Sequence, residues 1–419
     1  MENPASINGR HARPRSNETT LNRTVTLPLA VLYGLGVTVG AGIYVLIGVA
    51  ASRAGPYAPL SFLLAAIVMG LTAGTFAELV GRFPVSAGEA AYVQAGFRSE
   101  ALALIVGFLV VVAAMIAAAA IAHGSAGYLG LFFDLPQNLL VLIVLATMAG
   151  VAMAGISTSA TIAGIMTLIE LAGLIAIVVL GAWKHPALLR DVGVVWPVSG
   201  DGAAWSGVLA ATLLAFFAFI GFEGLVNIAE EVKAPQKTLP RAIFLTLAIA
   251  TVLYILVAWV ALRLIPPAEL AASKAPLSLV FERITAAPPH VVTAIAIDAT
   301  VNGIIAQIVF ASRVLYGLGK LGALPQAVAH VNARTQTPVR ASILVTGLAM
   351  LVATLFPIER LATFTSLITL VIFSLVNLSL LAIKWRKEPA PPGAFAVPIW
   401  VPAIGALTCL ALVLIGVTR

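Results

Sequence analysis

Apolar runs long enough to cross a lipid bilayer recur along almost the whole 419-residue chain. A helix needs about 20 consecutive apolar residues to span the hydrocarbon core of a membrane. Eleven segments meet or approach that length, at residues 27–51, 57–80, 101–133, 138–154, 160–183, 205–229, 241–265, 290–316, 341–357, 360–384 and 397–417. Because these runs are continuous rather than alternating, a membrane β-barrel is disfavoured. The sequence therefore predicts an all-α polytopic membrane protein with about eleven transmembrane helices.

The composition excludes several other classes of protein. Apolar residues make up 61% of the chain and charged residues 10%, against roughly 45–50% and 25% in soluble domains. The net charge of +7 suits loops that face an anionic membrane surface, so we expect a lipid bilayer and no nucleic acid as partner. The single cysteine, Cys409, excludes an intramolecular disulfide and a cysteine-rich metal site. Since a P-loop and a paired-histidine motif are also absent, we expect no enzyme, no cofactor and no metal site.

The distribution of lysine and arginine predicts the orientation in the membrane. With the N-terminus in the cytoplasm, 16 of the 24 basic residues fall in cytoplasmic segments and 8 fall outside. Loops rich in lysine and arginine stay on the cytoplasmic side. We therefore expect a multi-pass protein of the inner (cytoplasmic) membrane, with residues 1–26 as a cytoplasmic tail.

Two of the predicted spans contain glycines that disfavour a continuous helix. Four glycines fall in the nine residues from Gly34 to Gly42 of the first span, and each costs about 1 kcal/mol relative to alanine in a water-exposed helix. The sixth span holds a second pair, Gly221 and Gly224, around the carboxylate of Glu223. Interrupted helices at matching positions of two five-helix sets are typical of transporters built on inverted repeats. Close packing of helices at small residues is the alternative explanation.

The chemistry of two interrupted helices fits a zwitterion. Unwinding at Gly40 to Gly42 would expose backbone amides that favour a carboxylate. Carbonyl groups released between Phe217 and Ile220 would favour an ammonium group. An α-amino acid satisfies both ends at once.

Four motifs carry a resemblance to a known family. They are the first-helix segment Gly40-Ala41-Gly42-Ile43-Tyr44, the second-helix segment Phe76-Ala77-Glu78-Leu79 with Pro84 to Gly88, the sixth-helix segment Phe219 to Glu223 with Ala229 to Pro235, and the segment Ala311 to Gly317 after the eighth helix. At these positions the chain resembles the amino acid–polyamine–organocation transporter superfamily, and in particular permeases similar to bacterial cationic amino acid transporters.

The resemblance implies a five-plus-five inverted-repeat, leucine-transporter-like fold in which helices 1 and 6 are discontinuous. It divides the chain into the tail 1–26, a first repeat 27–183, a second repeat 205–384 and a final helix 397–417. Relatives usually have twelve helices, so the absence of a twelfth leaves the oligomer contacts open.

The resemblance also implies the site residues. The backbone of Val39, Gly40, Ala41, Gly42 and Ile43 would hold the substrate carboxylate, and the backbone of Phe216, Phe217, Ala218, Phe219 and Ile220 would hold its amino group. Phe217 matches an aromatic gate position, and Glu223 matches a carboxylate implicated in proton sensing. Glu170 stands where proton-coupled relatives have a lysine.

Three carboxylates lie inside the apolar runs and are candidates for proton coupling or gating: Glu170, Glu223 and Asp298. An acidic side chain at mid-membrane costs roughly 2.5–3.5 kcal/mol, so such residues are functional candidates by default. Structural explanations remain open for each of them. Glu170 also fits a neutral helix contact, Glu223 a structural gate network, and Asp298 a polar seam with Asn302 four residues on.

These observations predict a secondary active amino acid transporter that works by alternating access. Proton-coupled symport is the first hypothesis and amino acid exchange the second, while a channel or sensor on the same fold is a third. The identity of the amino acid and the oligomeric state are left open.

Overall fold

The computed structural model describes residues 23–84, 88–154, 160–190, 196–320, 322–332 and 334–418. Helices dominate this part of the chain, and its one β-contact is an isolated bridge between Val25 and Val232. Most of the predicted cytoplasmic tail lies outside the described residues.

Each predicted span corresponds to a helix at nearly the predicted bounds. These helices are α1 (Leu27–Ala54), α2 (Ala58–Arg82), α4 (Glu100–Leu129), α5 (Gln137–Met153), α6 (Ala160–Lys184), α8 (Gly202–Phe217) with the 3-10 segment η2 (Phe222–Ile228), α9 (Pro235–Leu264), α12 (His290–Lys320), α13 (Val339–Leu355), α14 (Ile358–Trp385) and α15 (Trp400–Val417). By length and hydropathy, eight stretches of the described residues qualify as membrane spans, and the one over Leu27–Arg82 contains both α1 and α2. Two shorter apolar helices, α5 and α13, complete the set.

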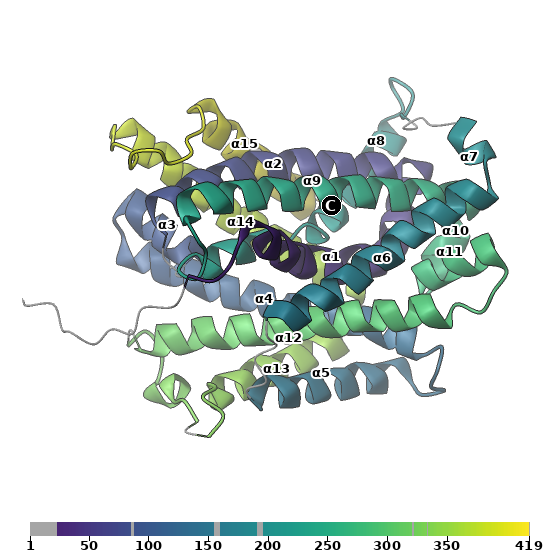
Figure 1. The fold of residues 1–419 in the computed structure, drawn as a ribbon, viewed down its shortest axis with the longest axis horizontal. Helices are drawn as coiled ribbons and strands as arrows, with labels where there is room; N and C mark the ends of the chain where they lie inside the picture. Colours follow the sequence, from purple (N-terminus) through teal and green to yellow (C-terminus); the bar gives the residue numbers. More distant parts are fainter. Residues whose placement is uncertain are drawn as a thin grey trace, which may run out of the picture.

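Short connecting helices were not predicted. They are η1 (Gly55–Tyr57), α3 (Gly88–Phe97), α7 (Ala187–Arg190), α10 (Pro267–Ala272), α11 (Pro276–Thr285) and η3 (Gln326–Ala329). Helix α3 lies at the left-hand end of the molecule in Figure 1, whereas α7, α10 and α11 lie at the right-hand end. Segments of this length carry too few turns for a hydrophobic period to identify them.

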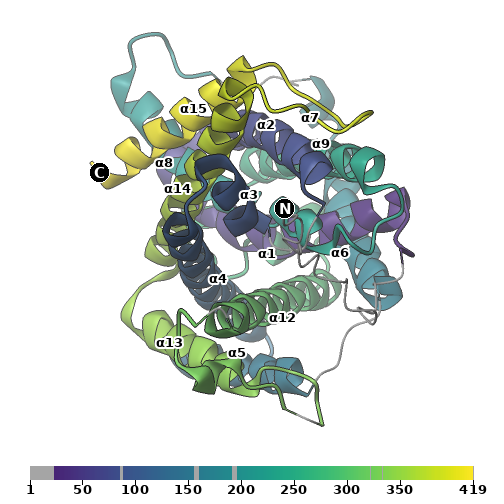
Figure 2. The same cartoon turned by 90° about the vertical axis from the view of Figure 1, so that its left-hand side faces the viewer.

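Helix α1 lies at the centre of the molecule. Seen from the end in Figure 2, α2, α4, α6, α9, α12 and α14 surround it, while α5, α13 and α15 lie outside this ring. Contacts of α1 with α6, α8, α9 and α12 agree with that view. The central helix is therefore surrounded by protein, where irregular backbone is tolerated in a membrane.

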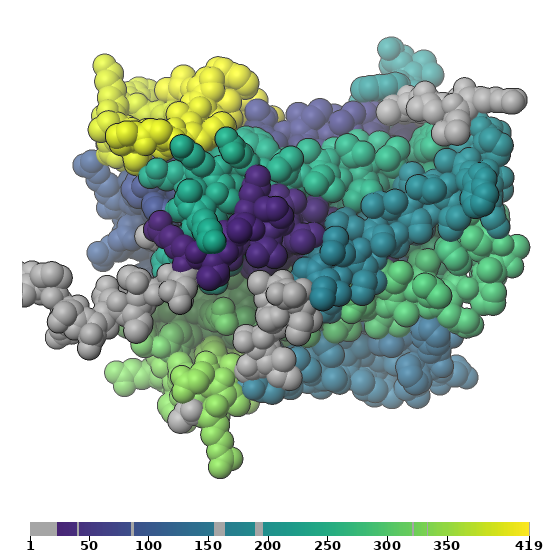
Figure 3. Space-filling view, in the orientation of Figure 1, coloured from purple at the N-terminus to yellow at the C-terminus, as the bar shows by residue number. Residues whose placement is uncertain are grey.

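The outer face of α6 shows how the molecule meets lipid. Figure 3 shows this helix crossing the surface between α9 and α12. Five of its exposed apolar side chains are about half accessible, namely Ile165, Leu168, Ile169, Ile175 and Val179, and Trp183 is 76% accessible. An apolar surface of this kind on a long helix suits hydrocarbon rather than water, as expected of a multi-pass membrane protein.

The first span differs from the prediction, because α1 is helical throughout from Leu27 to Ala54. Its glycines serve close packing instead of a break. A Cβ atom at Gly36 would lie 2.2 Å from the Thr167 hydroxyl oxygen, and one at Gly42 would lie 2.3 Å from the Cα of Ala218. The expected discontinuity of helix 1 is thus corrected to a continuous helix whose small residues admit its neighbours.

The predicted interruption of the sixth span is confirmed. Helix α8 ends at Phe217, a turn follows, and the chain resumes at Phe222 as the 3-10 segment η2. Gly221 has φ of +131°, a backbone conformation that glycine adopts and other residues rarely do. A Cβ atom there would also lie 2.6 Å from the carbonyl oxygen of Val37 on α1. The break therefore depends on this glycine both for its turn and for its contact with α1.

Candidate functional site

The break after α8 packs directly against the middle of α1. Its first residue, Ala218, contacts Gly42, and the hydroxyl of Tyr254 on α9 lies 2.8 Å from the carbonyl oxygens of both Ala218 and Thr38. Tyr254 is fully buried. One side chain therefore links the central helix to the interrupted one and satisfies polar backbone that a continuous α8 would have bonded within itself.

A small cavity of about 20 Å³ lies at this junction. It is lined by Val37, Thr38, Gly42, Ala117, Ile121, Phe217, Ile220, Gly303, Ala306 and Gln307. Three predicted binding residues, Gly42, Phe217 and Ile220, are thus brought together beside one cavity. The junction of α1 with the broken helix is where the sequence predicted the substrate.

Other predicted binding residues belong to the packed core. Val39, Ile43 and Ala218 are fully buried. Phe216 packs against Phe373, and Phe219 packs against Tyr254 with 5.0 Å between ring centres. The side-chain surroundings of Gly40 and Ala41 lie outside what the structure describes. Among the phenylalanines between Phe216 and Phe222, Phe217 is the one that lines the cavity of about 20 Å³ between α1 and the helix break.

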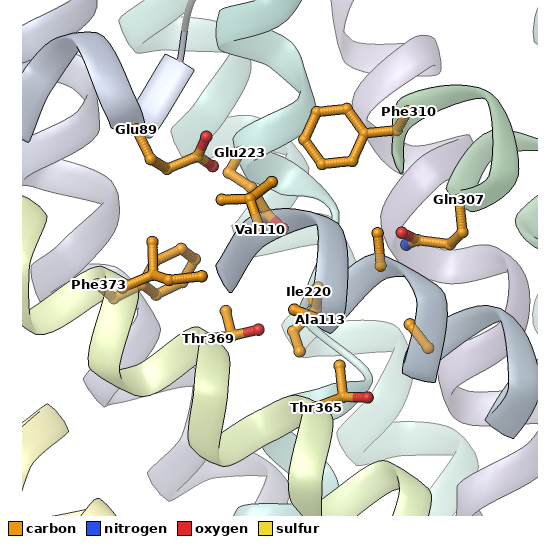
Figure 4. Close-up of a pocket in the computed structure, with 13 residues that line it drawn as sticks. Glu89, Val110, Ala113, Ile220, Glu223, Gln307, Phe310, Thr365, Thr369 and Phe373 are labelled. Atoms are coloured by element: carbon orange, nitrogen blue, oxygen red, sulfur yellow. The ribbon is translucent and has the colours of Figure 1, made fainter. Parts of the chain in front are cut away.

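A second cavity of about 30 Å³ adjoins the first (Figure 4). The two share Ala117, Ile220 and Gln307 as lining residues. The second cavity also meets the carboxylates of Glu89 and Glu223. Volumes of this size admit one or two water molecules each, so an amino acid enters only when the helices move apart.

Glu170 on α6 is fully buried, and neither of its carboxylate oxygens has a hydrogen-bond partner among the described residues. Its polar neighbours are Asp298 and Asn302, one turn apart on α12. Asp298 also has an oxygen without a partner in this part of the chain. The structure therefore brings together two of the three predicted carboxylates, from helices α6 and α12 that the sequence alone did not pair.

Two buried tyrosines connect α1 to its neighbours through hydrogen bonds from their hydroxyls to backbone carbonyl oxygens. Tyr44 on α1 donates to the carbonyl oxygen of Glu170 at 2.7 Å, and Tyr128 on α4 donates to the carbonyl oxygen of Tyr44 at 2.6 Å. These bonds fasten α6 and α4 to the central helix.

Glu223 lies apart from that pair, at the start of η2. One carboxylate oxygen accepts a hydrogen bond of 2.8 Å from the amide of Gly221. The side chain thus satisfies a backbone group freed by the helix break.

Two residues of this region were missed by the sequence analysis. Glu89 on α3 is 4% exposed, and burial raises the pKa of its carboxyl to about 7. Tyr254 bridges the two central elements. Glu89 follows directly on the segment Pro84 to Gly88 that the sequence analysis had singled out, so its position was a usable signal. For Tyr254 the only signal in the sequence was a polar hydroxyl within a long apolar run, and that signal is weak.

Taken together, a broken helix against a central one, cavities at their junction and buried carboxylates without partners define a membrane transporter. The family is then given by comparison with known proteins. The amino acid permease family matches residues 26–418, so the chain belongs to that family.

Relatives of known name extend over most of the chain. The branched-chain amino acid permease of Bacillus subtilis is 29% identical, with 95% of this chain and 89% of that protein covered. Human cationic amino acid transporter 4 is 31% identical over 90% of this chain, which spans only 62% of that longer protein. The methylthioribose transporter of Bacillus subtilis is 28% identical, with 94% and 89% covered.

A solved structure shows the same fold. A sodium-coupled sialic acid symporter in an outward-open state superposes with a TM-score of 0.63 at 13% identity, and covers 94% of this chain and 89% of the symporter chain. At that identity the likeness concerns the fold alone. The chain therefore has the five-plus-five, leucine-transporter-like architecture that the sequence predicted.

Proposed function

We propose that this protein is a secondary active amino acid transporter of the cytoplasmic membrane that works by alternating access as a proton symporter. The observation that carries the proposal is the helix break at Ala218 to Gly221, packed against α1 beside a small cavity. Family membership supports an amino acid as substrate.

The substrate would bind between α1 and the break. Carbonyl groups between Phe217 and Ile220 end a half-helix and carry partial negative charge, which suits an ammonium group. The substrate carboxylate would lie against the segment Val39 to Ile43 of α1. Thr38 and Gly42 already line the cavity at that level.

Glu170 is the residue that we propose to carry the proton. An ionised carboxylate at a fully buried position, with the side-chain amide of Asn302 rather than a cation beside it, is costly in a low-dielectric interior. Asp298 nearby adds a second acid rather than a counter-charge. A protonated Glu170 therefore suits the closed arrangement, and its release of the proton would follow when water reaches α6.

Uptake of radiolabelled amino acids into proteoliposomes tests the proposal. Saturable uptake that an inward proton gradient stimulates would support symport. Uptake that requires amino acid inside the vesicles and ignores the gradient would show exchange instead. Ion current that does not saturate would show a channel, and both of the latter results would overturn the proposed mechanism.

The proposed orientation has its own test. Cys409 is the single cysteine and is buried, so a cysteine introduced as Glu100→Cys at the exposed start of α4 would be the reactive one. In intact cells, a membrane-impermeant thiol reagent should leave this position unlabelled until the membrane is opened. Labelling from outside would reverse the proposed orientation.

A further inference from the structure

The segment ahead of α1 pairs with the segment that follows η2. The amide of Val25 donates a hydrogen bond of 3.0 Å to the carbonyl oxygen of Glu231, and the amide of Lys233 donates one of 2.9 Å to the carbonyl oxygen of Val25. These two bonds form the β-bridge between Val25 and Val232, whose side chains are 8% and 0% exposed. Figure 3 shows the purple start of α1 against the teal residues that lead into α9. Two segments far apart in the sequence are therefore joined through their backbones.

The contact between these two parts of the chain continues from the bridge to the helix break. A Cβ atom at Gly34 would lie 2.9 Å from the Leu225 side chain, and one at Gly221 would lie 2.6 Å from the carbonyl oxygen of Val37. Taken from the cavity to the start of α1, the contacting pairs are Gly42 with Ala218, Val37 with Gly221, Gly34 with Leu225 and Val25 with Val232. Residue numbers fall along α1 as they rise along the other segment, so the two stay in contact over this whole length.

The contact of the same half of α1 with α6 includes side chains packed at small residues. Gly36 admits the Thr167 side chain, and a Cβ atom at Gly164 would lie 3.7 Å from the Leu32 side chain. Packed helices can slide against each other by small steps, whereas the bridge can part only by leaving two amides and two carbonyl oxygens without their partners. If the cavity opens toward this end of the molecule, α1 therefore separates more readily from α6 than from η2.

We propose that the bridge between Val25 and Val232 ties the N-terminal half of α1 to η2 and to the start of α9, so that they move as one body when the cavity opens toward this end of the molecule. This inference rests on the proposed transport function and adds to it which elements move together. The segment η2 needs such a tie, because it has seven residues of 3-10 helix and follows α8 only through the turn at Gly221. A helix that short does not hold its position without a neighbour.

A disulfide across the bridge tests the tie. Neighbouring strands lie about 4.8 Å apart, within the range of about 4.4–6.8 Å that a disulfide spans between Cα atoms, so Val25→Cys with Val232→Cys can be crosslinked by oxidation. Cys409 is the single native cysteine and is buried. In proteoliposomes, the oxidised variant should take up a radiolabelled mixture of the standard amino acids within about twofold of its reduced form, because elements that move together tolerate a crosslink.

Leu32→Cys with Gly164→Cys is the matched pair, because it links the same half of α1 to α6. Oxidation of this pair should reduce uptake about tenfold, because it joins elements that have to separate, and reduction should restore uptake. Peptide mapping by mass spectrometry measures the crosslinked fraction in both variants, so that uptake is compared at equal crosslinking.

Spin labels provide a second measurement if either cysteine pair fails to fold or to crosslink. Arg23→Cys and Lys233→Cys place labels at exposed positions on the two sides of the bridge, and Arg313→Cys places one at an exposed position on α12. On addition of the same amino acid mixture, the distance between labels at 23 and 233 should keep its distribution, while the distance between labels at 233 and 313 should change. A change in the first distance, or none in the second, would overturn the inference.

The outcomes separate this inference from the proposed function. Loss of uptake on oxidation of the pair at 25 and 232, restored by reduction, would overturn the tie and leave transport intact. Uptake that neither crosslink affects would overturn it as well, because α1 would then not separate from α6. No uptake of any amino acid by the reduced proteins, the wild type included, would overturn the proposed function itself.

Discussion

The hydroxyl of Tyr254 on α9 lies 2.8 Å from the carbonyl oxygen of Ala218, the first residue after α8, and equally close to that of Thr38 on α1. A single buried donor thus faces two acceptors from the two elements between which the substrate is proposed to bind. The hydrogen bonds of Tyr254 therefore hold α1 and the helix break together in the closed site, and we expect them to break when the site opens.

Replacement of Tyr254 by phenylalanine should weaken this closure. It removes the donor and leaves two buried carbonyl oxygens without it, at a cost of about 1–3 kcal/mol. We expect a lower melting temperature in detergent and slower amino acid uptake in proteoliposomes. Tyr57→Phe, at the short connection η1, is the control and should change neither. Full stability and full uptake in Tyr254→Phe would show that the hydroxyl contributes to neither.

Gly221→Ala should be far more damaging than a glycine substitution within a regular helix. Its φ of +131° costs about 1–3 kcal/mol in a residue with a side chain, and the new Cβ would meet the Val37 carbonyl oxygen at 2.6 Å. We expect at least a tenfold loss of uptake together with a lower melting temperature. Gly347→Ala in α13 has open space around it and should gain about 0.5–1 kcal/mol. Equal effects of the two substitutions would contradict this account of the break.

The two glycine-rich spans show how far the sequence could predict the fold. Both lower the local helix propensity, yet α8 breaks and α1 continues. The difference lies in tertiary contacts, because Gly36 and Gly42 admit Thr167 and Ala218 at distances that any side chain would prevent. Helix propensity can be read along one segment, whereas close packing depends on a partner far away in the chain. The span positions, set by continuous hydrophobicity, were predicted to within a few residues.

The same distinction explains the carboxylates. Sequence identified Glu170 and Asp298 separately as intramembrane acids, but only folding shows that α6 and α12 bring them together. Glu89 belongs to a ten-residue helix outside the predicted spans. The search for acidic residues inside membrane spans therefore could not identify it.

Glu170→Gln should uncouple transport from the proton gradient. Glutamine keeps the volume of the side chain but cannot release a proton, so the gradient should no longer stimulate uptake. Binding measured by thermal shift should remain within about threefold of the wild type, because Glu170 lines neither described cavity. Uptake without a gradient provides the reference for each protein. Unchanged stimulation in Glu170→Gln would exclude Glu170 as the coupling residue.

The stability of the protein should fall as the pH rises through neutrality, partly because of Glu89. Burial raises the pKa of its carboxyl from 4.5 to about 7, so the folded state holds this proton more tightly than the unfolded state does. The contribution is fully present below about pH 4.5 and is lost as the pH rises through about 7. A shift of this size corresponds to about 3 kcal/mol.

Melting temperatures measured between pH 5 and 8 in the absence of substrate check this expectation. The wild type should lose stability across the range, and Glu89→Gln should lose less because glutamine does not titrate. Glu223 is the other carboxyl of the cavity that Glu89 lines, whereas Tyr92 stays neutral across the range because burial raises its pKa further above the usual 10. Parallel curves for the two proteins would show that Glu89 does not titrate in this window.

Glu78 on α2 should prove structural. The sequence places it at the end of a span, where a solvated contact would be ordinary, but the side chain is fully buried and forms ion pairs with Arg82 at 2.8 Å and Lys384 at 2.7 Å. It also accepts the amide of Val397 at 2.8 Å, ahead of α15. One carboxylate thus joins α2, α14 and the approach to α15. Glu78→Gln leaves two partly buried cations without their counter-charge, and losing one partner of a buried pair costs about 3–5 kcal/mol.

We expect the Glu78 variant to show a large drop in melting temperature and in folded yield, while the protein that does fold keeps its substrate preference. Glu388→Gln is the matched control, because Glu388 also pairs with two arginines, at 2.8 Å and 3.0 Å, but in an exposed position. Exposed pairs are screened by solvent and contribute little, so this control should melt close to the wild type. Similar melting of both variants would mean that burial of Glu78 adds nothing to its ion pairs, and a changed substrate preference in folded Glu78→Gln would assign it to the transport site instead.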